Sequence, residues 1–164
     1  MNRQIQETLA GAEGRYLTKA EQAVLREHAA RLDARLTAME EVQGKEEAII
    51  EQLTKEILRA YPDFEQKYKH GRKCCVRDTT LVLRYAVQAM VRADLPYLDD
   101  ALLTWMGTIL RGVGFTANFV EDTYKTLERI AERELSPAAA ELLRPYLAHV
   151  TTTLSGAVAG RKRS

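Results

Sequence analysis

Residues 75–114 read CVRDTTLVLRYAVQAMVRADLPYLDDALLTWMGTILRGVG, and this stretch opens with a thiol, a cation and a carboxylate. Cys75 is the first residue of this stretch, and the only other cysteine of the chain, Cys74, directly precedes it. Cys75 and Asp78 are three residues apart, so on a helix they share one face. Arg77 is offset from that face but is long enough to fold over the same pocket mouth. The stretch therefore predicts a helix that brings three chemically different groups to one place.

These groups suit a ligand that carries both carboxylates and N–H groups. Two further cations, Arg72 and Lys73, precede the cysteines. A thiol at a helix start beside cations is expected to have a lowered pKa and a raised reactivity. A carboxylate accepts hydrogen bonds from ligand N–H groups, and an arginine clamps a ligand carboxylate. The alternative is an ordinary solvated helix turn, in which the cysteines are small buried fillers.

The composition is that of a soluble globular protein of 164 residues, so we expect one domain over residues 1–164. The 24 basic and 23 acidic groups nearly cancel and give no reason to expect a nucleic-acid partner. No apolar run reaches the roughly 20 residues that a bilayer requires, and the polar start MNRQIQETLAG is unlike a signal peptide. Adjacent cysteines offer no disulfide framework. We therefore expect a reduced, cytoplasmic protein without membrane insertion.

The pattern is helical almost throughout, because good helix formers dominate and only four prolines occur. Thr18 and Glu21 form a capping box at one helix start. Thr116 and the Ser136–Pro137 pair mark two further starts. Gly44 predicts a pause between two helices, and the polar residues 63–73 predict a loop. The expected helices cover about residues 2–12, 18–43, 45–60, 74–93, 99–111, 116–135 and 137 onward.

The stretch from Cys75 resembles the middle of a phycobiliprotein subunit of the phycocyanin and allophycocyanin kind. The family pattern is Cys-x-Arg-Asp, four residues, Leu-Arg-Tyr, and then Gly-Asp, Leu-Asp-Asp and a closing Leu-Gly. The start of the chain, AGAEGRYLTKAE over residues 10–21, is similar to the family's Ala-Asp-x-x-x-Arg-Tyr-Leu-Ser-x-x-Glu. The resemblance therefore covers nearly the whole chain. The matching groups are Cys75-Val76-Arg77-Asp78, Leu83-Arg84-Tyr85, Ala93-Asp94, Leu98-Asp99-Asp100 and Val113-Gly114.

The resemblance implies an all-α, globin-like phycobiliprotein fold with two extra N-terminal helices. About residues 1–43 would hold the dimerisation helices and the first core helix, and about residues 45–158 the rest of the globin core. It also implies a bilin, a linear tetrapyrrole such as phycocyanobilin, held by a thioether to Cys75. Arg77 would pair with a bilin propionate, and Asp78 would accept hydrogen bonds from the inner pyrrole nitrogens.

The same resemblance implies a protein of light harvesting and energy transfer in a phycobilisome-type antenna, or of bilin handling, and not an enzyme. A bilin lyase is an expected partner for attachment. An antenna role would place the cytoplasmic protein at the surface of a thylakoid membrane. Arg72, Lys73 and Cys74 complete the predicted bilin site.

The chain departs from the family pattern around the predicted pocket. The loop before Cys75 is shortened, and it is basic and aromatic instead of rich in Gly, Asn and small residues. Ala93 stands where Gly is usual, and Trp105 stands where a small residue is common. Leu110 and Gln88 occupy positions at which the family often has tyrosine. We therefore expect a pocket of different shape.

Haem is the alternative ligand of a globin-like core. The alternative function is a globin-like sensor or a protein of bilin metabolism that binds haem or bilin non-covalently or has lost its chromophore. Haem ligation normally requires a histidine on the helix that faces the pocket. Of His28, His70 and His149, only His70 lies close in sequence to the predicted pocket. No His, Cys or Asp cluster has metal-ligand spacing.

The N-terminal segment predicts a subunit contact. Ile5 and Leu9 form an apolar stripe that is too narrow to make a core of its own. The resemblance points to a homodimer, or to a heterodimer with a phycobiliprotein-like subunit, through these helices. The alternative is that the segment folds back on its own chain. The predicted interface residues are Glu13, Arg15 and Tyr16 of one chain, facing Arg84, Arg92 or Asp94 of the other.

Overall fold

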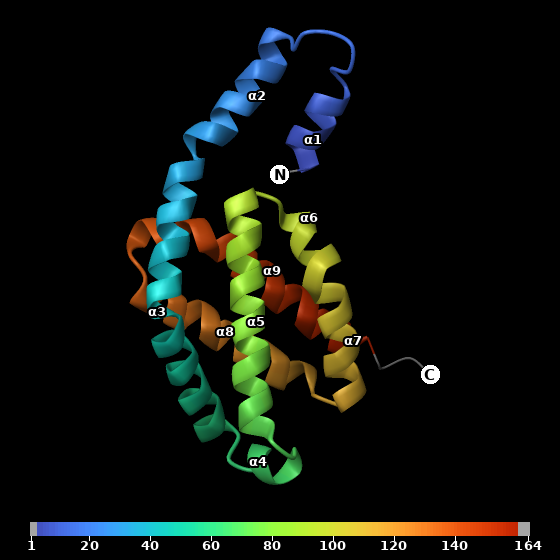
Figure 1. Cartoon of the computed structure of the whole chain (residues 1–164). Helices are drawn as coiled ribbons and strands as arrows, with labels where there is room; N and C mark the ends of the chain where they lie inside the picture. Colours follow the sequence, from blue (N-terminus) through green and yellow to red (C-terminus); the bar gives the residue numbers. More distant parts are fainter. Residues whose placement is uncertain (1–2, 161–164) are drawn as a thin grey trace.

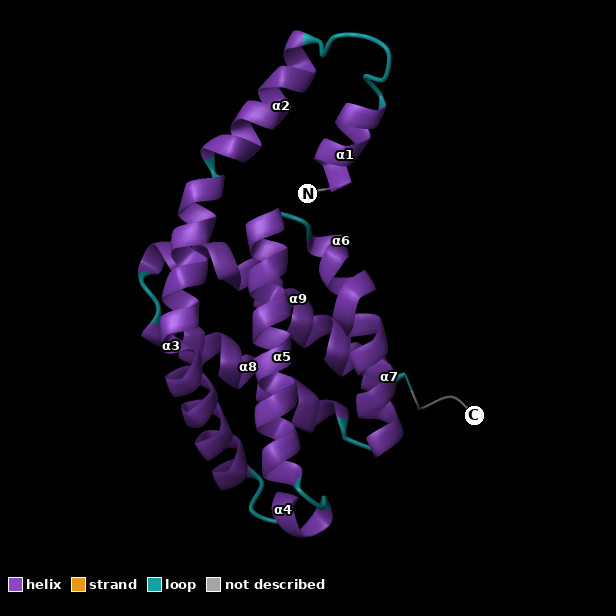
Figure 2. Cartoon of the chain, in the orientation of Figure 1, coloured by secondary structure: helices purple, strands orange, loops and turns teal. Residues whose placement is uncertain are grey.

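A computed structural model describes residues 3–160, and every regular element in that range is helical (Figures 1 and 2). The all-α prediction is therefore confirmed. No helix in this range is both long and apolar enough to cross a membrane. In chain order the elements are α1 (Arg3–Ala10), α2 (Lys19–Ala30), α3 (Leu32–Ala60), α4 (Phe64–Lys67), α5 (Gly71–Arg92), α6 (Leu95–Leu98), the π-helical segment η1 (Asp99–Leu103), α7 (Thr104–Val113), α8 (Ala117–Glu134) and α9 (Pro137–Ala159).

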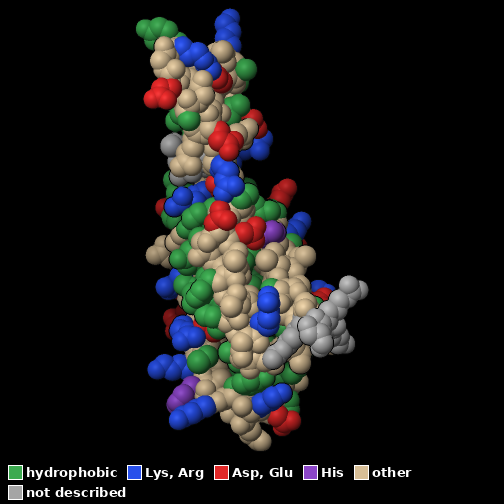
Figure 3. Space-filling view, turned by 90° about the vertical axis from the view of Figure 1, so that its right-hand side faces the viewer, with side chains coloured by type: hydrophobic (Ala, Val, Ile, Leu, Met, Phe, Trp, Pro, Cys, Tyr) green, Lys and Arg blue, Asp and Glu red, His purple; other side chains and the backbone are tan. Residues whose placement is uncertain are grey.

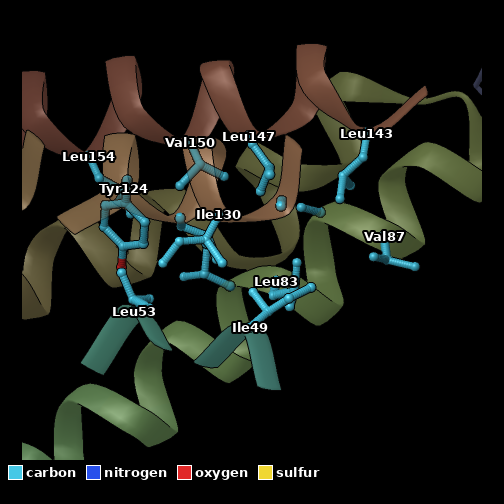
Figure 4. Close-up of a cluster of buried hydrophobic side chains, with 14 of the residues drawn as sticks. Ile49, Leu53, Leu83, Val87, Tyr124, Ile130, Leu143, Leu147, Val150 and Leu154 are labelled. Carbon is cyan, nitrogen blue, oxygen red and sulfur yellow. The ribbon is translucent and has the colours of Figure 1, made fainter. Parts of the chain in front are cut away.

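The core of the globular body is built from α3, α5, α8 and α9. Helices α8 and α9 pack along each other, and both also contact α3. Figure 4 shows side chains from all four helices meeting in one cluster. Complete burial of one large aliphatic side chain contributes about 1.5–3 kcal/mol. Fully enclosed examples are Ile49, Leu53, Leu83, Ile130 and Leu143.

Three predicted helix starts are confirmed because their side-chain caps form. Thr18 Oγ1 accepts the Glu21 N–H at 3.3 Å, and the Glu21 carboxylate accepts the Thr18 N–H at 2.7 Å. The hydroxyls of Thr116 and Ser136 each accept the backbone N–H of the residue three positions later, at 3.2 and 3.3 Å. Each cap satisfies a backbone N–H that has no partner within the helix.

The predicted pause at Gly44 is wrong. Helix α3 continues through Gly44, and the interruption falls at Arg31, between α2 and α3. A glycine inside a helix costs only about 1 kcal/mol relative to alanine. Glu41 accepts the Ser136 N–H at 2.7 Å and ties this part of α3 to the start of α9. Tertiary contacts therefore outweigh the local preference at Gly44.

The region before the cysteines is more helical than predicted. Residues 63–73 contain α4 and the first turn of α5. Helix α5 begins at Gly71, where an added Cβ atom would lie 2.8 Å from the Phe64 ring. Glycine therefore allows α5 to begin directly against that ring.

The segment after α5 also begins earlier than predicted. The sequence predicts a helix start at Asp99 or Asp100, but Asp94 accepts the Tyr97 N–H at 3.2 Å and caps α6 at Leu95. Helix α6 then passes through η1 into α7 without a loop.

Two non-glycine residues with left-handed backbone bound α5. His70 precedes the helix with φ 61°, and Ala93 follows it with φ 51°. This conformation costs roughly 1–2 kcal/mol for a residue with a Cβ atom. Ala93 is the position at which the family pattern has glycine, so the backbone explains that family preference.

Helices α1 and α2 form an arm that stands off the globular body as a narrow column (Figure 3). Helix α1 turns back toward the body, and the Arg3 N–H donates to Asp94 at 3.0 Å. The Arg3 guanidinium also pairs with the exposed Asp100 at 2.8 Å. Of the predicted apolar stripe, Ile5 is buried and Leu9 is 41% exposed. Helix α1 therefore folds back on its own chain, and a dimer contact through the arm stays a prediction.

Candidate functional site

A cavity of about 320 Å³ lies where α4 and the start of α5 meet the end of α7 and the start of α8. This volume falls within the range of about 300–1,000 Å³ that is common for small-molecule sites. Two of the six predicted ligand residues, Arg72 and Lys73, are exposed and are not part of its lining. The other four line the cavity together: Cys74, Cys75, Arg77 and Asp78.

Cys75 is a protonated, half-buried thiol. Burial raises its pKa from 9.0 to about 11, with smaller contributions from Asp78 and Cys74. The predicted lowering of this pKa is therefore wrong. The helix begins at Gly71, so Cys75 lies beyond the first turn, where the field of the helix end falls off. The cations that precede it are exposed and are screened by water.

Arg77 and Asp78 form an ion pair at the edge of the cavity. Arg77 Nε donates to Asp78 Oδ1 at 2.7 Å. The Arg77 side chain is 70% exposed, and that of Asp78 is 20% exposed. The hydrogen bond raises the pKa of the Arg77 guanidinium. An ion pair this exposed contributes about 0–1 kcal/mol, so a ligand can replace it at little cost.

An aromatic wall, defined as Phe64, Tyr68, Phe115 and Phe119, closes one side of the cavity. The Phe64 ring lies 5.2 Å from Tyr68 and 5.0 Å from Phe119, and Phe115 lies 4.8 Å from Tyr68. Sequence analysis did not identify this wall as part of the site. The available signal was the repeated spacing of four residues between Phe64 and Tyr68, at the end of α4, and between Phe115 and Phe119, at the start of α8.

Cations also come from the last residue of α4 and from the segment that follows it. Lys67 and Lys69 belong to the cavity lining, and the Lys67 ammonium lies 5.5 Å from the centre of the Tyr68 ring. Figure 3 shows Lys and Arg side chains at this lower end of the body. His70 is exposed and lies outside the lining. The short basic segment therefore supplies lysines to the cavity but not its histidine.

The threonines of the cavity lining are already hydrogen-bonded within their own helices. Thr79 Oγ1 donates to the Cys75 carbonyl oxygen at 2.7 Å, and Thr123 Oγ1 donates to the Phe119 carbonyl oxygen at 2.7 Å. Both side chains are therefore fixed, and the polar groups left for a ligand are few.

The positions at which the chain departs from the family pattern have different surroundings. Leu110 is buried and belongs to the cavity lining. Trp105 is 56% exposed on α7. Gln88 accepts a hydrogen bond from the Tyr97 hydroxyl at 2.9 Å, away from the cavity. Only Leu110 of these three alters the cavity itself.

The three histidines lie outside the cavity lining. His28 is beside Arg35, with 3.5 Å between Nδ1 and the guanidinium, and burial lowers its pKa. His149 Nε2 lies 2.7 Å from Asp99 Oδ1 on the other side of the body. Among residues 3–160, no group of three or more His, Cys, Asp or Glu side chains is arranged to hold a metal ion. This arrangement offers no histidine ligand for haem to the cavity.

Several predicted interface residues have partners within the chain. Arg15 pairs with Glu21 at 2.7 Å, and Arg84 pairs with Glu46 at 2.6 Å. Asp94 is buried by its contact with α1 and by its capping role. Of the remaining three predicted residues, Glu13 and Tyr16 are exposed, Tyr16 to 98%. The Arg92 guanidinium lies 4.2 Å from the centre of the Tyr97 ring.

The fold and the cavity define a class: an all-helical, globin-like protein with a thiol, an arginine and a carboxylate at one cavity. Residues 8–154 match the family model described as phycobilisome protein, and the chain belongs to this family. The family consists of bilin-binding light-harvesting proteins that assemble as oligomers and are not enzymes. No curated protein sequence matches the chain.

Proposed function

We propose that this chain carries one bilin, joined to Cys75 by a thioether, as a light-harvesting subunit of a phycobilisome-type antenna. The observation that supports this proposal most strongly is the shared cavity of Cys75, Arg77 and Asp78. Lys67 and Lys69 add positive charge to the same lining. A linear tetrapyrrole presents propionates, N–H groups and a reactive terminal ring, and these correspond to the cations, the carboxylate and the thiol.

Binding exchanges the Arg77–Asp78 ion pair for two contacts with the ligand. The 2.7 Å hydrogen bond between them is weak in free-energy terms because Arg77 is exposed. In our proposal Arg77 turns to a propionate, and the Asp78 carboxylate accepts hydrogen bonds from the inner pyrrole N–H groups. Charge-assisted hydrogen bonds of this kind are stronger than neutral ones. The aromatic wall then holds the rings rigid and limits energy loss through internal rotation.

Attachment at Cys75 requires an activating partner. A thiol with a pKa of about 11 is ionised in only about one molecule in 10⁴ at pH 7, and the thiolate is the nucleophile. We therefore include a bilin lyase in the proposal, acting on a chain whose cavity has opened. Non-covalent binding in the same cavity is the alternative that this raised pKa favours.

Co-expression of the chain with a bilin-producing pathway and a lyase tests the proposal. The purified protein is denatured in acidic urea and its absorbance is recorded beside that of Cys75→Ala. We expect pigment that stays on the wild type and is absent from Cys75→Ala. Cys74→Ala is the matched control, because it removes the adjacent thiol from the same lining and should keep the pigment. Pigment that leaves the denatured wild type would show non-covalent binding.

We also propose that the arm joins two subunits, either of this chain or of a related one. Tyr16 is almost fully exposed and Leu9 is 41% exposed on this arm, and Leu36 is 37% exposed at the adjoining start of α3. Leu9→Ser should therefore shift the protein toward the monomer in sedimentation velocity. Val113→Ser is the control, since Val113 is 48% exposed at the opposite end of the body. An unchanged sedimentation coefficient for a dimeric Leu9→Ser would rule out this contact.

A further inference from the structure

Tyr124 is a buried polar side chain that neither the fold nor the proposed pigment contacts explain. It belongs to α8, is only 4% exposed and lines the cavity. Figure 4 shows its ring within the core cluster beside α3. Within the described residues 3–160, its hydroxyl makes no hydrogen bond.

Tyr124 borders the cavity. No side-chain oxygen or nitrogen among the described residues is both fully enclosed and without a partner. The Tyr124 hydroxyl has no partner, so it must retain some accessible surface, although the residue as a whole is buried. Because Tyr124 is a lining residue, a molecule in the cavity is the natural source of a partner.

The hydroxyl acts as a neutral hydrogen-bond donor. Burial and the nearby Cys75 and Asp78 raise the pKa of Tyr124, so the phenol keeps its proton at all ordinary pH values. The threonines and the carboxylate of the lining already have partners, because Thr79 and Thr123 bond to their own helices and Asp78 to Arg77. A ligand therefore needs an acceptor at this point, and neither pyrrole N–H groups nor a methyl group provides one.

A bilin has such an acceptor next to its attachment point. Each terminal ring is a lactam with a carbonyl oxygen, and Cys75 is one of the two groups whose charge raises the pKa of Tyr124. We propose that the Tyr124 hydroxyl donates a hydrogen bond to the lactam carbonyl of the terminal ring that is joined to Cys75. This inference rests on the proposed function and makes Tyr124 a positioning residue for that ring.

Tyr124→Phe tests the inference, with Tyr146→Phe as the matched control. Tyr146 is a half-buried tyrosine of α9 that lies outside the cavity lining. The lactam carbonyl stretch of the pigmented proteins is measured by resonance Raman spectroscopy, because a hydrogen bond lowers this frequency. We expect the carbonyl frequency to rise in Tyr124→Phe and to stay at its wild-type value in Tyr146→Phe.

The apoprotein provides the second measurement. The hydroxyl has no partner without a ligand, so Tyr124→Phe should leave the melting temperature of the apoprotein unchanged or raise it. An apoprotein that is destabilised or unfolded by Tyr124→Phe would overturn the inference, because the hydroxyl would then serve the fold. A folded variant that loses pigment uptake supports the inference, since phenylalanine keeps the ring in place.

The two proposals fail in distinguishable ways. A pigmented Tyr124→Phe protein with the wild-type carbonyl frequency overturns only the role of Tyr124. A wild type that takes up no bilin overturns the proposed function and this inference together.

Discussion

The two ends of α5 share the same backbone conformation but have different surroundings. His70 and Ala93 both have left-handed backbone, one before the helix and the other after it. After Ala93, the Asp94 carboxylate accepts the N–H groups of Tyr97 and Arg3, so this end is closed by the chain's own polar groups. After His70, the helix instead passes a cavity of about 320 Å³.

The difference lies in what each end leaves without a partner. At the closed end, Asp94 joins α1, α5 and α6 and is itself buried. At the open end, Cys75 keeps a free thiol and Tyr124 keeps a free hydroxyl. The comparison teaches that one helix can be anchored by the chain's own polar groups at one end and border a cavity at the other.

The largest effect is expected from damage to the open end. Phe64→Ala removes a buried ring on which Tyr68, Phe115 and Phe119 all pack, and should lower the free energy of unfolding by about 3–5 kcal/mol. Urea unfolding monitored by circular dichroism measures this loss in the free energy of unfolding. Phe115→Ala is the control, and its loss should be smaller because Phe115 is only half-buried. Equal losses would show that the wall does not depend on Phe64.

A second effect concerns the reactivity of Cys75. In a Cys74→Ala background, alkylation of Cys75 at pH 7 should be about 100-fold slower than that of N-acetylcysteine, since its pKa is raised from 9.0 to about 11. The rate should rise about tenfold per pH unit as the thiolate forms. Mass spectrometry follows the reaction, and a rate equal to that of the free thiol would contradict the raised pKa.

The same shift makes a prediction for stability. The pKa of Cys75 is higher in the folded protein than in the unfolded chain. Its contribution to the free energy of unfolding is therefore fully present below about pH 9 and is lost as the pH rises through about 11. Cys75→Ala should therefore show a weaker loss of stability over that window than the wild type.

A smaller effect is expected at the closed end. Asp94→Ala removes the cap of α6 and the acceptor of the Arg3 N–H, and should cost about 1–2 kcal/mol. It should also expose the arm to earlier cleavage in limited proteolysis. Asp100→Ala is the control, because Asp100 is exposed and only its surface pair with Arg3 is lost. Similar losses in both variants would mean that burial of Asp94 contributes nothing.

The smallest effect is a gain. Ala93→Gly relieves the left-handed backbone at the end of α5 and should stabilise the protein by about 0.5–1 kcal/mol. Ala34→Gly, at an exposed position inside α3, should instead destabilise it by about 1 kcal/mol. Thermal unfolding of both variants measures the pair, and a destabilised Ala93→Gly would contradict the strain at this position.

Features set by neighbouring residues were the ones that the sequence could predict. The caps at Thr18, Thr116 and Ser136 depend on a side chain and an N–H only three residues away, so their chemistry is visible in the sequence. The break at Arg31 depends on how α2 and α3 meet the rest of the fold, and no local signal marks it. For the same reason, Gly44 suggested a break that packing does not permit.

The candidate site divides in the same manner. Cys75, Arg77 and Asp78 were predicted because they lie within four residues, and they do line one cavity. The pKa of Cys75 was predicted in the wrong direction, because it depends on burial in the folded protein. Tyr124 was missed because it is 49 positions further along the chain than Cys75 and meets it only in the folded protein.

The two threonine hydroxyls that donate to their own helices bear on how a bound pigment could lose energy. Because the hydroxyls of Thr79 and Thr123 are fixed to their own helices, they would be poor partners in excited-state proton transfer, a common route by which dyes lose energy as heat. Any change in the fluorescence lifetime of the pigmented protein when H₂O is replaced by D₂O should therefore come from other polar groups of the lining, such as Lys67, Cys74 and Tyr124.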